Sequence, residues 1–145
     1  MSPAALSFDA PPERVFEVLA DSRSYSHWVV GSRSVEGDDG RWPAAGSTFA
    51  HTQGVWPLIV ADETEVAASE PPRRLELVAK ARPLLVARVV LELSPEGGGT
   101  RVTMDEHPLS GLVAPLLRLP PGALLTRLRN EQALRRLRRL ADARG

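Results

Sequence analysis

The sequence predicts an α+β protein in which an antiparallel strand meander is combined with one long C-terminal helix. Three observations lead to this fold class. Apolar and polar residues alternate from residue 32 to 107, and glycine- and proline-rich turns interrupt the alternation at short intervals. After a proline-rich connection, the apolar period becomes helical from Gly122 to Ala143. Strands joined by tight turns favour an antiparallel sheet.

The chain begins with a short strand and two small helices. Leu6, Phe8 and Ala10 alternate with polar residues, and the pair Pro11 and Pro12 ends this strand. The same prolines can open a helix, because proline is favoured in the first helical turn. Segment 21–28 has the features of a second short helix. The apolar stripe of the first helix consists of Val15, Phe16, Val18 and Leu19.

The middle of the chain is expected to form six further strands. Their approximate ranges are 31–36, 46–53, 58–69, 73–82, 84–94 and 100–107. In the fourth of these, Leu75, Leu77 and Ala79 share one face and charged residues occupy the other. This pattern is typical of a sheet that is buried on one side. With the first strand, the predicted sheet has seven strands.

The C-terminal helix shows a change of apolar face. Leu124, Leu125 and Leu128 cluster on one side. The apolar residues of the second half lie roughly opposite: Ala133, Leu134, Leu137, Leu140 and Ala141. Either the second half of the helix packs on the sheet while the first half contacts a different surface, or the helix breaks near Asn130.

Four features of the chain form a recognisable set: the opening run from Phe8 to Asp21, Trp28, the turn at residues 70–75, and the turn at residues 97–103. Together they resemble the polyketide cyclase/dehydrase and START-like superfamily, also called SRPBCC. The resemblance covers almost the whole chain and implies a single domain, 1–145, with the helix-grip fold. In that fold a curved seven-stranded sheet grips the last helix and leaves a cavity between them. Because members include carriers, receptors and enzymes, the resemblance leaves function open.

Composition excludes several kinds of site. The 145 residues include no cysteine and three histidines, so disulfides and a zinc site are not expected, and no cofactor is predicted. No apolar run reaches the length of about 18 residues that a membrane span needs, and the first residues do not resemble a signal peptide. The sequence therefore predicts a soluble cytoplasmic protein, either a monomer or a homodimer.

The C-terminal region is basic although the formal net charge is zero. From Arg118 onward eight arginines face only two acids, Glu131 and Asp142. This helix face could bind nucleic acid or an anionic membrane, but a solvated face is the favoured interpretation. No aromatic side chain lies among the arginines to stack on bases, so no nucleic-acid partner is expected.

Three ionisable residues fall on the inner face by the two-residue period of their strands. They are His51, Asp62 and Glu106. One interpretation is an acid/base pair, His51 with either carboxylate, that moves a proton on a carbonyl compound. The other, favoured, interpretation is a satisfied polar cluster at the mouth of a pocket. Buried charges need partners in either case.

Apolar residues of the same faces are predicted to line a ligand pocket. The set is Trp28, Phe49, Trp56, Val60, Leu77, Val89, Leu91, Met104, Leu124 and Leu128. Trp28 has an alternative role as plain core beneath the second helix. Trp56 lies in a hairpin tip beside Gly54 and Pro57, which makes it a candidate gate.

The leading functional hypothesis is a module that binds a small hydrophobic ligand, such as a lipid, isoprenoid or polyketide-like molecule, by burying apolar area. The alternative is a cyclase or dehydratase that uses the ionisable residues of the same pocket. A third possibility is an interaction protein that meets another macromolecule through the basic helix or Trp56.

Overall fold

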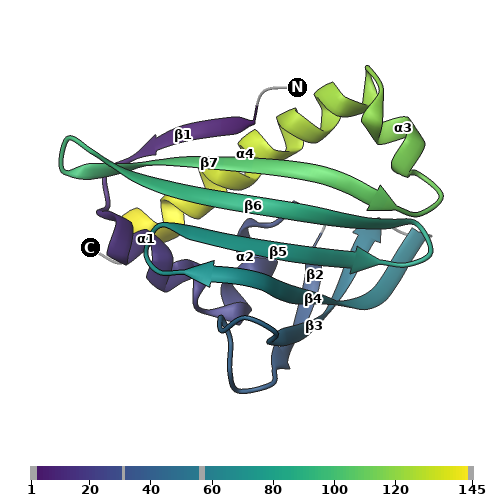
Figure 1. Ribbon diagram of the computed structural model, residues 1–145, viewed down its shortest axis with the longest axis horizontal. Helices are drawn as coiled ribbons and strands as arrows, with labels where there is room; N and C mark the ends of the chain where they lie inside the picture. The colour runs from purple at the N-terminus through teal and green to yellow at the C-terminus, as the bar shows by residue number, and fades with distance from the viewer. Residues whose placement is uncertain (1–2, 31, 56–57, 144–145) are drawn as a thin grey trace.

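A seven-stranded antiparallel sheet forms the frame of the computed structural model, which describes residues 3–30, 32–55 and 58–143 (Figure 1). The strands are β1 (Ala4–Phe8), β2 (Ser32–Asp38), β3 (Thr48–Val55), β4 (Leu58–Glu70), β5 (Arg74–Ala81), β6 (Leu85–Glu96) and β7 (Gly99–Ser110). The helical segments are α1 (Pro12–Leu19), the short 3₁₀ turn η1 (Ser22–Ser24), α2 (Tyr25–Trp28), α3 (Ala114–Arg118) and α4 (Gly122–Ala143). The strand order is β1-β7-β6-β5-β4-β3-β2.

The sheet is a meander whose last strand returns to the first. Strands β2 to β7 pair with their neighbours in sequence, and β1 pairs with β7 along the register Ala4↔Met104 to Phe8↔Thr100. In Figure 1, β6 and β7 run nearly horizontally whereas β2 and β3 run steeply, so the sheet is strongly curved. This curvature gives the sheet a concave face that α4 covers.

The predicted second helix is divided into η1 and α2. The Asp21 carboxylate accepts a hydrogen bond from the Arg23 backbone N–H at 3.1 Å, which caps η1. Tyr25 and Trp28 then face the same side, with ring centroids 4.8 Å apart, and both are buried. This aromatic pair packs the short helices against the core.

Helix α4 is continuous and completes the core. Its buried residues in the second half, Leu134, Leu137 and Ala141, join a cluster that includes the inner residues of α1 and of the central strands. The helix packs on β1, β7, α1 and α2. A curved antiparallel sheet around a long C-terminal helix, with short helices after the first strand, confirms the predicted helix-grip fold.

The connection before α4 differs from the prediction. Strand β7 continues past residue 107 to Ser110, and helix α3 forms within the proline-rich stretch. The Leu112 and Val113 backbone N–H groups donate to Pro83 and Leu84, which ties this stretch to the hairpin between β5 and β6. These partners are distant in sequence, so the local pattern does not reveal them.

Leu124 and Leu128, which the sequence predicts to line the pocket, lie on another side of α4. They are 46% and 50% exposed and lie outside the cavity lining. Because α4 is unbroken at Asn130, a single stripe of the helix faces the sheet over its whole length, and Ala133 and Leu137 fix that stripe. The early leucines fall roughly opposite to it.

Candidate functional site

An apolar cavity of about 90 Å³ lies between the concave face of the sheet and α4. We call it the inner cavity. Most of its wall is apolar, with side chains from α2, the sheet and α4. Polar groups come mainly from Gln53, Thr64, Glu106, Arg129 and Asn130. An apolar space with a few polar groups is the usual make-up of a small-molecule site.

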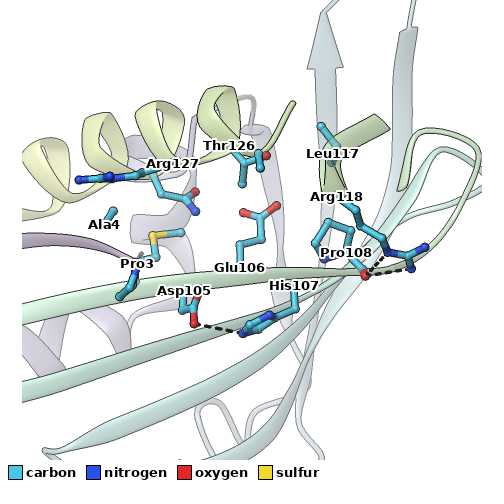
Figure 2. A pocket seen from close by; sticks show the side chains of 13 residues that line it. Pro3, Ala4, Asp105, Glu106, His107, Pro108, Leu117, Arg118, Thr126 and Arg127 are labelled. Carbon is cyan, nitrogen blue, oxygen red and sulfur yellow. Dashed lines mark hydrogen bonds and ion pairs between the residues drawn. The ribbon is translucent and has the colours of Figure 1, made fainter. Parts of the chain in front are cut away.

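A second, more polar space of about 220 Å³ opens beside the part of β7 that extends past β1. We call it the lateral cleft. Residues 105–108 of β7, together with side chains of α3 and α4, line it. Figure 2 shows the Glu106 carboxylate directed from β7 toward the helix that carries Thr126 and Arg127. Met104, Glu106 and Asn130 border both spaces, so they form the wall between the cleft and the inner cavity.

An ion pair stands in this wall. Arg129 Nη2 donates to the Glu106 carboxylate, with distances of 2.7 and 2.5 Å to its two oxygens. The Glu106 side chain is 5% exposed and that of Arg129 is 37% exposed. Removal of one partner from such a pair leaves a charge without compensation in a poorly solvated place. The pair therefore joins α4 to β7 at the point where the two spaces meet.

His51 is buried on the inner face of β3, between the cavity-lining residues Phe49 and Gln53. Its ring centroid lies 5.7 Å from that of Phe49. Neither ring nitrogen has a hydrogen-bond partner within the described part of the chain. Burial lowers the pKa of His51, and the backbone of Glu63 and the charge of Asp62 only partly offset this effect. The imidazole is therefore neutral at pH 7.

Asp62 lies opposite His51 in the register of β3 and β4, but its hydrogen bonds go elsewhere. Its carboxylate accepts from Arg82 Nε at 2.9 Å, from Arg82 Nη2 at 2.7 Å and from the Arg82 backbone N–H at 2.9 Å. These hydrogen bonds hold the pKa of Asp62 well below its usual range. Asp62 is thus a fixed anion whose acceptor capacity is largely used by one arginine.

The structure places the three predicted acid/base residues on one face without joining them by hydrogen bonds. Glu106 is bonded to Arg129 and Asp62 to Arg82, whereas His51 has no such bond among the described residues. Sequence reasoning missed both arginines. Arg129 lies one helical turn before Ala133, and this spacing could have placed it beside the inner stripe.

The predicted ligand-lining residues divide into four groups. Trp28, Phe49, Leu77, Val89 and Met104 border the inner cavity. Leu91 is fully buried in the core, and Val60 is partly buried; neither is in the lining. Leu124 and Leu128 face outward, and Trp56 lies outside the described residues. Trp28 also donates from Nε1 to Ser24 Oγ at 3.3 Å, so it is both core and cavity wall.

Two negative findings apply to the described ranges 3–30, 32–55 and 58–143. Among these residues, no three histidine or carboxylate side chains gather in a way that could hold a metal ion. Likewise, none of the helices built from them is both long and apolar enough to cross a bilayer. The cytoplasmic location and the oligomeric state stay predictions.

The curved sheet, the long closing helix and the apolar space between them define the class of helix-grip proteins. The family described as "Polyketide cyclase / dehydrase and lipid transport" matches residues 4–142, so the chain belongs to this family and to the SRPBCC superfamily. A search of curated proteins finds no significant match.

Solved structures show the same fold. TTHA0849 from Thermus thermophilus is 22% identical with a TM-score of 0.74, over 99% of this chain and 97% of that one. MLL2253 from Mesorhizobium loti is 21% identical with a TM-score of 0.64, over 99% of both chains. Ara h 8.0201 is 11% identical with a TM-score of 0.69, over 98% of this chain and 97% of that one. At these identities the likeness concerns the fold alone.

Proposed function

We propose that the protein binds a small, slender hydrophobic ligand whose apolar part occupies the inner cavity. The observation that carries this proposal is an apolar space, walled by residues such as Phe49, Leu77 and Val89, that has an ion pair at one end. Apolar walls favour a ligand by removing its surface from water, and the polar end fixes its orientation. Membership of a family described by lipid transport supports the same class of ligand.

The volume of the inner cavity limits the size of the ligand. Typical ligand pockets measure about 300–1,000 Å³, and the inner cavity measures about 90 Å³. The lateral cleft adds room across the shared wall of Met104, Glu106 and Asn130. A ligand that spans this wall places its polar head near Arg129 and Asn130, where hydrogen-bond donors are available. Lipids with a single chain or narrow isoprenoids fit this description better than bulky fused rings.

Filling the cavity tests the proposal. Ala79 lines the inner cavity, so Ala79→Phe introduces a ring into the space that the ligand would occupy. The matched control is Ala61→Phe, because Ala61 is exposed on β4. A dansyl-labelled fatty acid is titrated into both variants and into the wild type. We expect saturable fluorescence for the wild type and Ala61→Phe, and at least about tenfold weaker binding for Ala79→Phe.

Native mass spectrometry of the purified protein gives an independent measurement, because a retained lipid adds its own mass. Binding of the probe by Ala79→Phe with unchanged affinity would contradict the proposed location. Absence of any bound lipid, together with no saturable probe binding by the wild type, would reject the ligand-binding function itself.

A second candidate, a cyclase or dehydratase, rests on His51. A buried, neutral imidazole without a described hydrogen-bond partner can accept a proton, as general-base chemistry requires. His51 does not border the inner cavity, so a substrate would have to displace Phe49 or Gln53 to reach it. For this candidate, His51→Ala must abolish turnover of a polyketide-like substrate while it leaves fatty-acid binding intact; equal turnover would exclude it.

A further inference from the structure

Seven leucines near one corner of the molecule are exposed to an unusual degree. They are Leu109, Leu112, Leu116, Leu119, Leu124, Leu125 and Leu128, and we call them the leucine surface. Their exposed fractions range from 46% to 73%. Single exposed leucines are common, but a group of them marks a site of protein or membrane contact.

The leucine surface belongs to the structure that joins β7 to α4. It begins at the end of β7, continues over α3 and ends on the first half of α4, at the upper right of Figure 1. Gly122 allows α3 to approach α4 closely, since a Cβ there would lie 2.0 Å from the Leu116 carbonyl oxygen. The two helices are therefore packed together, and their leucines are held on a fixed framework.

The charges beside the leucine surface are mainly positive. On the outer stripe of α4, Leu124 and Leu128 are followed at helical spacing by Arg135 and Arg139, which are both exposed. Arg118 is also exposed and donates to the carbonyl oxygens of Pro108 and Leu109. Two acids belong to the same helix: Glu131, which is paired with Arg127, and Asp142.

We propose that the leucine surface docks the protein on an anionic lipid bilayer, with the leucines in the interfacial region and the arginines near lipid phosphates. Interfacial helices combine apolar side chains with arginine or lysine in this way. Each basic residue close to an anionic membrane adds to the attraction. A second copy of the chain is a poorer occupant, because a two-fold interface pairs the same patch and gathers arginines of like charge.

Docking in this orientation has a consequence for the lateral cleft. Leu117, Arg118, Ala123 and Arg127 line the cleft and alternate with the leucine surface along α3 and α4. The cleft would thus open close to the lipid headgroups. The docking itself does not depend on the ligand proposed for the inner cavity.

Vesicle sedimentation tests the inference. Wild-type protein is mixed with vesicles of phosphatidylcholine alone or with added phosphatidylglycerol, and we expect binding to the anionic vesicles that weakens with salt. Leu125→Gln/Leu128→Gln and Arg135→Gln/Arg139→Gln should each reduce the partition coefficient by about tenfold or more. Arg33→Gln/Arg101→Gln removes two exposed arginines elsewhere and should bind as the wild type does.

Further variants separate docking from folding and from dimerisation. Leu125→Met/Leu128→Met keeps the apolar character and should restore binding, and the melting temperature of each variant verifies folding. Failure of the wild type to bind anionic vesicles would overturn the inference. The inference would also be overturned if the wild type did not bind vesicles but formed a dimer in sedimentation velocity, and Leu125→Gln/Leu128→Gln dissociated that dimer. The leucine surface would then contact a second copy of the chain. Dansyl fatty-acid binding tests the inner cavity separately.

Discussion

At the scale of single residues, the inner face holds three ionisable groups that meet the cost of burial in two ways. Glu106 is paired with Arg129 and Asp62 with Arg82, whereas His51 avoids that cost by remaining neutral. Each state follows from the same rule, that a charge removed from water needs a partner. His51 is the group among them without a hydrogen bond in the described residues, which makes it sensitive to acid.

Stability should fall in mild acid because of His51. Its pKa is lower in the folded protein than in the unfolded chain, so the unfolded state binds the proton first, near pH 6.5, and unfolding becomes easier as pH falls below that value. Urea unfolding from pH 8 to pH 5 measures the effect. In His51→Gln the fall in stability from pH 6.5 to pH 5 should be smaller than in the wild type, and an equal fall in both proteins would contradict this account.

The Glu106–Arg129 pair should show a coupling between its members. Glu106→Gln leaves the Arg129 guanidinium without its anion in the wall of the inner cavity, and we expect a loss of about 1–3 kcal/mol in the free energy of unfolding. In a double-mutant cycle, Glu106→Gln/Arg129→Met should cost less than the sum of the single changes. Strict additivity would mean that the pair contributes nothing to holding α4 against β7.

At the scale of elements, α4 has two apolar stripes in different surroundings. The stripe of Leu134, Leu137 and Ala141 is buried against the sheet and the N-terminal helices. The stripe of Leu124 and Leu128 faces outward beside α3. A continuous helix can hold only one stripe against a sheet, so the second stripe stays available for another contact.

Matched leucine truncations distinguish the two stripes. Leu137 is fully buried, so Leu137→Ala removes apolar contacts and leaves a cavity, with an expected loss of about 3 kcal/mol. Leu124 is 46% exposed, and Leu124→Ala should change the free energy of unfolding by about 0.5 kcal/mol or less. Urea denaturation of the two variants gives the comparison; equal losses would show that Leu124 is buried in solution.

At the scale of the whole molecule, the sheet is well packed at β6 and β7 and weaker at its β2 edge. Strands β6 and β7 carry many fully buried residues and pair along almost their whole length. Edge strand β2 has two register shifts against β3 and no fully buried residue among those described. The inner cavity lies between these regions, beneath α4, so its walls differ in local stability.

Hydrogen exchange should report this difference. Amides of β6 and β7 are expected to exchange only through global unfolding, whereas those of β2 should exchange through local opening with a much lower free energy. Exchange rates measured by NMR at two denaturant concentrations distinguish global from local opening, because the free energy of global opening falls with denaturant and that of local opening does not. Protection of β2 equal to that of β6 would contradict this view of the edge.

The sequence by itself determined the order of elements and most inner faces. Side-chain alternation has a period of two, and each turn is marked by glycine or proline, so strands such as β5 and β6 follow from local pattern. The limits of α4 were also evident, from Gly122 to Ala143. The short helix α3 was not, because its anchoring hydrogen bonds reach residues at the β5–β6 hairpin.

Only the tertiary structure decided what each inner residue does. It assigned Arg82 to Asp62 and Arg129 to Glu106, left His51 unpaired among the described residues, and turned Leu124 and Leu128 away from the cavity. These outcomes depend on the angle and distance at which α4 meets the sheet. Periodicity reports the direction of a side chain relative to its own element, whereas a hydrogen bond or a cavity requires the position of a second element.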